Sequence, residues 1–89
     1  MTDPLQALRA QFIDRCRADL ARLEALPEGD DEVTSVVHRL AGSAGSFGFP
    51  MVSLIAAEID LRTRNGTRPS RRQLDDLKAS LRKAIEQSY

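Results

Sequence analysis

Four segments of this chain carry apolar residues three or four positions apart, and proline, glycine or capping residues separate the segments. This spacing places the apolar side chains on one face of an α-helix, whereas a half-buried strand requires strict alternation, which is not evident here. Four amphipathic helices joined by short connections predict an all-α fold, an antiparallel up-down-up-down four-helix bundle. The length of 89 residues allows one domain, so residues 1–89 are expected to fold as a single unit.

The first helix is expected to open at Thr2 or Asp3, either of which can act as its cap. Pro4 then takes the first helical position, where its missing N–H costs nothing. Pro27 and Gly29 end the helix and begin a turn. The expected buried stripe consists of Leu5, Leu8, Phe12, Cys16, Leu20, Leu23 and Leu26.

The second helix is expected to start near Asp30 or Asp31, the third to run from about Pro50 to Arg64, and the fourth from a Ser70 cap to about Gln87. The Asn65-Gly66 pair suits a left-handed cap at the end of the third helix. The expected buried residues are Val33, Val36, Val37, Leu40, Ala44 and Phe47, then Met51, Leu54, Ile55, Ile59 and Leu61, and finally Leu74, Leu77, Leu81 and Ile85.

The composition excludes several kinds of protein. Lys and Arg number 13 and so do Asp and Glu, so bulk polyelectrolyte binding to nucleic acid is not expected. A single cysteine, Cys16, can form neither an internal disulfide nor a structural zinc site. The longest nearly apolar stretch, residues 49–57, is about half of the roughly 20 residues that a membrane span needs. No basic segment followed by an apolar run opens the chain, so a cytoplasmic location without a membrane partner is expected.

Charge is distributed unevenly along the chain. Residues 1–32 hold eight acidic and four basic side chains, whereas residues 62–83 hold eight basic and two acidic ones. A nucleic-acid footprint is one interpretation, but few aromatic residues interleave the basic ones and the net charge is zero. We therefore favour a solvated face that also steers an acidic partner toward the domain.

The one histidine of the chain, His38, is expected on the exposed side of the second helix. A helix advances about 100° per residue, which places His38 about 140° from the apolar stripe. Gly45 and Gly42 fall near the same direction, at about 120° and about 180°. Because a glycine inside a helix costs about 1 kcal/mol relative to alanine, two of them beside a lone histidine suggest that space is cleared for a bulky group.

The chemistry open to an isolated histidine is limited. A hydrolytic triad needs a nucleophile aimed at the ring, and Ser43 and Ser46 project about 140° and about 80° away from it. A metal site needs further converging ligands, and no second histidine or cysteine is present. The glycine-rich stretch lacks the lysine of a nucleotide-binding P-loop. Covalent chemistry on the ring remains, because neutral imidazole is nucleophilic near physiological pH.

The pattern His-x-Leu-x-Gly-Ser-Ala-Gly-x-Phe-Gly-Phe, read from His38 to Phe49, resembles the signature of histidine-containing phosphotransfer (HPt) domains of multistep phosphorelays. The resemblance extends from about Val33 to Arg64, and the four-helix pattern carries it across the chain. It implies that His38 carries a phosphoryl group on Nε2 and that Gly42 leaves room for that group and for a docking receiver domain.

The same resemblance assigns expectations to neighbouring residues. Many members of the family carry a lysine three residues after the histidine, where this chain has Ala41. Arg39 and Arg64 are the candidates to contact phosphate in its place. Asp60 is expected to hydrogen-bond Nδ1 of His38, which would fix the ring tautomer.

The partners implied by the resemblance are response-regulator receiver domains and a hybrid histidine kinase. Mg²⁺ is expected in the receiver, and no cofactor is expected in this domain, which would be a monomeric carrier without a self-contained catalytic cycle. Two other hypotheses stay open. In the first, the domain would be a docking module that carries no phosphate, as the missing cation at Ala41 suggests. In the second, it would be a small helical nucleic-acid binder that uses the fourth helix.

Overall fold

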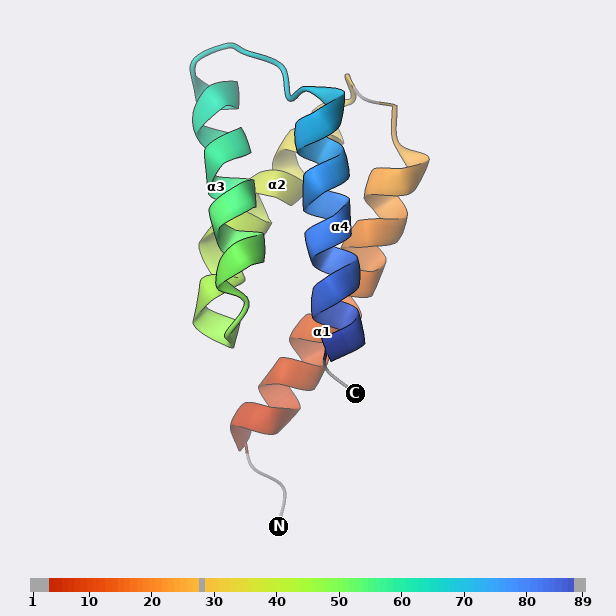
Figure 1. Cartoon of the computed structure of the whole chain (residues 1–89), viewed down its shortest axis with the longest axis vertical. Coiled ribbons are helices and arrows are strands. Elements are labelled where there is room, and N and C mark those ends of the chain that lie inside the picture. Colours follow the sequence, from red (N-terminus) through yellow and green to blue (C-terminus); the bar gives the residue numbers. More distant parts are fainter. Residues whose placement is uncertain (1–3, 28, 88–89) are drawn as a thin grey trace.

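In the computed structural model, which describes residues 4–27 and 29–87, the chain forms four α-helices and one short 3₁₀ helix. They are α1 (Pro4–Ala25), α2 (Asp31–Ser43), η1 (Gly45–Phe47), α3 (Pro50–Arg64) and α4 (Arg71–Gln87). These residues include no strand, which confirms the all-α prediction. Figure 1 places the α1–α2 and α3–α4 connections at one end of the molecule, with the start of α1 and the end of α4 toward the other.

Side chains cap α2 and α4 as the sequence predicts. The Asp30 carboxylate accepts a hydrogen bond of 2.9 Å from the backbone N–H of Glu32. At α4, the N–H of Gln73 donates to Ser70 Oγ at 3.1 Å, and the N–H of Ser70 donates to Gln73 Oε1 at 2.9 Å. This reciprocal pair is a capping box, which satisfies backbone donors that a helix start leaves without partners.

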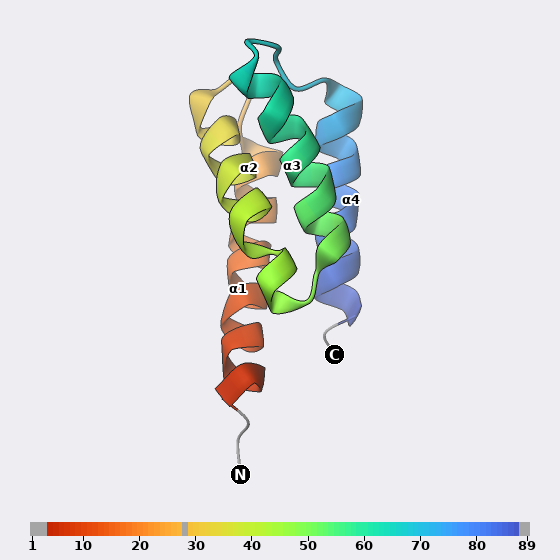
Figure 2. The same ribbon diagram turned by 90° about the vertical axis from the view of Figure 1, so that its left-hand side faces the viewer.

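The beginning of α1 differs from the prediction. Residues 4–11 are all exposed, including Leu5 at 69% and Leu8 at 46%, so these two leucines do not belong to the core. Figures 1 and 2 show the reason, because α1 begins well beyond the ends of the neighbouring helices. The predicted caps, Thr2 and Asp3, lie outside the described residues. The rest of the stripe is buried or half-buried at Phe12, Cys16, Leu20, Leu23 and Leu26.

The predicted core of α2 and α4 is largely confirmed. Phe47 is half-buried in η1 rather than in α2, and in α4 Ala84 is buried while Ile85 is half-buried. The Phe12 ring of α1 stacks on Phe47 and Phe49 at centroid distances of 4.7 and 5.6 Å, which ties η1 and the start of α3 to α1. The confirmed buried residues are Val33, Val36, Val37, Leu40, Ala44, Leu74, Leu77 and Leu81.

The predicted buried face of α3 is wrong at three positions. Met51, Leu54 and Leu61 are 61%, 64% and 62% exposed. Ile59 is buried as predicted and Ile55 is half-buried, while the buried face also contains Val52 and Ala56. Ala56 has no exposed surface, and its small side chain lets α3 lie close to the helices on both sides. Figure 2 shows α3 between α2 and α4. Within the described part of the chain, no helix has the length and apolar content that a membrane span requires.

Candidate functional site

The site is built around His38 on α2 and Asp60 on α3. His38 Nδ1 lies 3.2 Å from each of the two carboxylate oxygens of Asp60. The His38 side chain is 64% exposed, whereas that of Asp60 is only 13% exposed. The expected contact between these two residues is therefore present, although they are 22 positions apart in the sequence. A well-held carboxylate orients an imidazole that otherwise faces solvent.

This contact determines which ring nitrogen can react. A carboxylate only accepts hydrogen bonds, so Nδ1 must carry the hydrogen and donate it to Asp60. In the neutral ring, Nε2 then has no hydrogen and keeps its lone pair. The two helices thus present an exposed imidazole with its nucleophilic nitrogen away from Asp60.

Arg64 joins the pair from the next turn of α3. Its Nη2 lies 3.3 Å from Asp60 Oδ2, four residues earlier on the same helix. The Arg64 side chain is 64% exposed, so the guanidinium remains accessible while it contacts the carboxylate. A guanidinium has five N–H donors, and one contact leaves others available for a second anion. The structure therefore groups His38, Asp60 and Arg64, three of the predicted site residues.

The two glycines of the site have different surroundings. A Cβ added to Gly42 would meet nothing within 4 Å, so the surface one turn after His38 is open. A Cβ added to Gly45 would lie 3.4 Å from Ser53 Oγ on α3. Gly45 belongs to η1, because α2 ends at Ser43. It faces Ser53 of α3 at an ordinary van der Waals distance for an added Cβ.

Arg39 is directed away from His38. Its Nη2 donates to Asp19 Oδ1 of α1 at 2.5 Å, on the other side of α2. The Asp19 side chain is only 5% exposed, and its Oδ2 is buried without a hydrogen-bond partner among the described residues. The expectation that Arg39 contacts phosphate is therefore not supported by its position, because this guanidinium compensates a buried carboxylate.

Asp19 is a residue that the sequence analysis missed. Burial raises the pKa of its carboxyl above the ordinary value, while the Arg39 guanidinium acts in the opposite direction. A signal was present in the sequence, because Asp19 lies three residues after Cys16 and four before Leu23, on the apolar stripe of α1. An acidic residue at such a position needs a cationic partner.

Other potentially reactive groups lie outside this arrangement. Ser43 Oγ donates to the backbone carbonyl of Arg39 at 2.8 Å. Cys16 has no exposed surface, and burial together with nearby Asp19 raises the pKa of its thiol to about 11. Over residues 4–27 and 29–87, no three His, Cys, Asp or Glu side chains are grouped as metal ligands would be.

Comparison with known families agrees with this geometry. A family model described as the Hpt domain matches residues 7–88, nearly the whole chain. The chain belongs to the Hpt family. Comparisons with curated proteins and with solved structures gave no match. Hpt domains are phosphotransfer carriers rather than classical enzymes, and they work with receiver domains and histidine kinases in phosphorelays.

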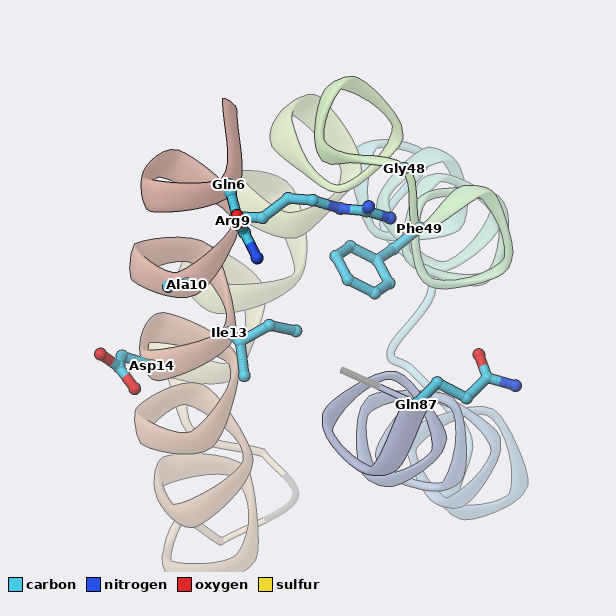
Figure 3. A pocket seen from close by; sticks show the side chains of 8 residues that line it. All are labelled: Gln6, Arg9, Ala10, Ile13, Asp14, Gly48, Phe49 and Gln87. Carbon is cyan, nitrogen blue, oxygen red and sulfur yellow. The ribbon is translucent and has the colours of Figure 1, made fainter. Parts of the chain in front are cut away.

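A pocket of this Hpt domain lies apart from His38, between α1, the start of α3 and the end of α4 (Figure 3). Arg9 extends across it toward Gly48 and Phe49, as the figure shows. Its Nε–H donates to the carbonyl of Phe47 at 3.3 Å, and its guanidinium carbon lies 5.6 Å from the Phe49 ring centroid. Arg9 thereby anchors the connection between α2 and α3 to α1.

Proposed function

We propose that His38 is the phosphoryl carrier of this Hpt domain. Its Nε2 accepts a phosphoryl group from an aspartyl phosphate on a receiver domain, or from a kinase, and passes it to the aspartate of another receiver. The observation that supports this most directly is the contact of Nδ1 with both oxygens of Asp60. That contact leaves the lone pair of Nε2 on the exposed side of the ring.

The transfer step balances without an additional reactant. The Nε2 lone pair forms a bond to phosphorus while the bond between phosphorus and the aspartate oxygen of the receiver breaks. The electrons of the broken bond leave with that oxygen, which becomes part of a carboxylate. Nδ1 keeps its hydrogen, and the Asp60 carboxylate stabilises the positive charge that the ring acquires. Transfer onward is the same step in reverse.

Arg64 is the cation that we assign to the phosphoryl oxygens. Ala41 cannot supply the positive charge that many relatives place three residues after the histidine, and Arg39 is bound to Asp19. Arg64 is exposed and already contacts Asp60, so it shares a carboxylate with the His38 ring. Gly42 leaves an open surface on which the phosphoryl group and the receiver approach.

We also propose the partners, the location and the oligomeric state of this domain. The partners are response-regulator receiver domains and a hybrid histidine kinase, and the domain acts as a cytoplasmic monomer. Mg²⁺ is held by the receiver, because this ion favours carboxylate oxygens. We also infer an antiparallel up-down-up-down order for the helices, which connections at alternate ends of the bundle support.

Labelled phospho-receivers, offered to the wild-type domain and to His38→Gln, test the carrier role. Label is expected only on the wild type, and it should show the acid lability and base stability of phosphohistidine. The variant should fold normally because the His38 side chain is 64% exposed, and thermal unfolding checks this. Label that persists on His38→Gln would reject the assignment.

Asp60→Asn tests the positioning role of Asp60 in the same assay. The amide keeps the size of the side chain but removes the negative charge beside the ring. Transfer is expected to slow roughly ten- to hundredfold, which corresponds to a hydrogen bond to a charged group of about 1.5–3 kcal/mol. An unchanged rate in a folded variant would contradict this role.

The second candidate is a docking module that binds a receiver or kinase without carrying phosphate. The absence of a cation at Ala41 favours it. In that case receivers would bind the wild type and His38→Gln equally well, and neither protein would take up label from any phospho-receiver.

A further inference from the structure

The exposed face of α3 beside His38 has the properties of a docking surface. We propose that this face, the α3 patch of Leu54, Ala57, Leu61 and Arg64, binds the acidic protein surface that surrounds the partner's phosphoaspartate. The inference rests on the proposed function, and it places the partner over α3 rather than over α1.

The position of the patch follows from the helix geometry. Around α3, Arg64 lies about 40° from Asp60 and Leu61 about 100° from it in the same direction, with Ala57 between them. Leu54 lies within about 20° of Leu61 and two turns away along the helix. The Asp60 contact draws the His38 ring toward α3, so the patch continues directly from the reactive side chain.

The chemistry of the patch is that of an interface core with a charged rim. Leu54 and Leu61 are 64% and 62% exposed and lie on the same face of α3. Glu58, at the far edge, is paired with Arg62 at 3.9 Å, so a second cation lies beside this carboxylate. Burial of the leucines against a partner would remove apolar surface from water.

The charge around the patch indicates an acidic partner. Residues 61–74 contain five arginines and neither aspartate nor glutamate, and they extend from the end of α3 to the start of α4. A protein that carries an acyl phosphate on aspartate and holds Mg²⁺ must present several carboxylates at its reacting surface. Opposite charges on two protein surfaces accelerate the association of the two proteins and orient them relative to each other.

The opposite side of α2 is less suited to this role. There Leu5 lies near the start of α1, the part that extends past the ends of α2 and α3 in Figure 2, while Leu8 lines a hollow with Phe12, Phe47 and Arg39. The cation on that side, Arg39, already neutralises Asp19. Leu5 is 69% exposed and therefore provides a matched control for Leu54 and Leu61.

The test uses the full chain and a panel of isolated receiver domains with Mg²⁺, phosphorylated by a small acyl phosphate. Binding and phosphoryl transfer are measured for wild type, Leu54→Ser, Leu61→Ser and the control Leu5→Ser, after thermal unfolding has confirmed that each folds. Each patch variant is expected to weaken binding and slow subsaturating transfer about tenfold, as loss of an interface hot spot does. Leu5→Ser should match the wild type.

Charge is tested by neutralising arginines that do not touch the reacting atoms. The double variant Arg68→Gln, Arg72→Gln should bind more slowly and show a weaker salt dependence than Arg17→Gln, Lys83→Gln, which removes the same net charge elsewhere. Equal salt dependence in the two double variants would overturn the electrostatic part of the proposal.

The outcomes separate this inference from the carrier role. If the wild type takes up label and Leu54→Ser and Leu61→Ser take it up equally fast, the α3 patch is rejected and the carrier role stays intact. Binding that depends on both leucines, without uptake of label by the wild type, would support the patch and reject the carrier role. A larger loss in Leu5→Ser than in either patch variant would place the partner over α1 and overturn the proposal.

Discussion

Arg39→Ala is expected to destabilise this domain far more than loss of a half-exposed arginine usually does. The substitution removes the guanidinium that donates to Asp19 Oδ1, and it leaves that carboxylate buried between α1 and α2. Asp19 Oδ2 already lacks a hydrogen-bond partner among the described residues, and Arg15 is the remaining cation that lowers the pKa of this carboxyl. Much of the compensation of this buried charge therefore comes from the one contact between Arg39 and Asp19.

The size of the effect follows from the exposure of the two side chains. Breaking a fully buried ion pair costs about 3–5 kcal/mol, whereas an exposed pair contributes about 0–1 kcal/mol. Asp19 is 5% exposed and Arg39 is 42% exposed, so we expect a loss of about 2–3 kcal/mol, between these limits. The control Arg62→Ala, whose pair with Glu58 is exposed on both sides, should change stability by less than about 1 kcal/mol.

The sign of the pH dependence follows from the raised pKa of Asp19. Below the ordinary value of 3.8 the carboxyl is protonated in both the folded and the unfolded chain, and its burial costs least. As the pH rises through the folded-state pKa, the folded state loses stability, because charge is favoured more strongly in the unfolded chain. Without Arg39, which lowers this pKa, the loss extends to higher pH. The cost of Arg39→Ala should therefore be greatest at neutral pH and shrink toward pH 3.8.

Urea unfolding followed by circular dichroism, from neutral to acidic pH, tests this reasoning. The proteins are wild type, Arg39→Ala, Asp19→Asn and the double variant. Asp19→Asn should be at least as stable as wild type at neutral pH, and in the double variant it should restore most of the stability lost in Arg39→Ala. The reasoning is refuted if the cost of Arg39→Ala is the same at every pH, or if the double variant is as unstable as Arg39→Ala.

Three further predictions concern two glycine positions and the buried thiol. Gly42→Gln should raise the free energy of unfolding by somewhat less than about 1 kcal/mol, because it improves helix propensity at an open position. The same variant should slow phosphoryl transfer from a phospho-receiver, and an unchanged rate would contradict the role of Gly42. Gly48→Ala should instead destabilise the fold by about 1 kcal/mol or more, since Gly48 has φ of 87° and an added Cβ would lie 2.9 Å from Arg9 Nη2. Urea titration of Gly42→Gln and Gly48→Ala should therefore show changes of opposite sign in the free energy of unfolding. Cys16, with no exposed surface and a thiol pKa raised to about 11, should react with a thiol reagent at neutral pH only as fast as the fold opens, and rapid stoichiometric labelling without urea would show otherwise.

The sequence predicts the helices well and one helix face poorly. The apolar positions of α2 and α4 lie on a single stripe, so periodicity identifies their buried residues. On α3, periodicity and hydrophobicity identify Ile59 as buried but also favour Met51, Leu54 and Leu61, which are exposed. The structure instead buries Val52 and Ala56, and the small Ala56 side chain permits close packing of α3 against both α2 and α4. That choice depends on neighbouring helices, which periodicity does not describe.

The candidate site was predictable where it depends on local pattern and less so where it depends on tertiary contacts. His38 and Gly42 follow from one helix turn, and the family resemblance supplies the contact with Asp60. The place of Gly45 in η1 does not follow from periodicity, because the end of α2 at Ser43 is set by the turn that follows. The contact of Arg39 with Asp19 could not be predicted because Asp19 lies 20 positions away on another helix.

The hydrogen bond from Ser53 Oγ to the carbonyl of Ala41, at 3.2 Å, has a consequence for the lengths of the connections. It joins the same two helices as the His38–Asp60 contact, about two turns earlier on α3, and depends on the same alignment of α2 with α3. Sliding α3 by one residue would move Asp60 about 1.5 Å and turn it about 100° away from the ring. A residue inserted between Ser43 and Pro50 that slid α3 in this way would break the His38–Asp60 contact, whereas residues added within 65–70 follow both contacts in the chain. The length of the first connection is therefore linked to the chemistry at His38, and that of the second is not.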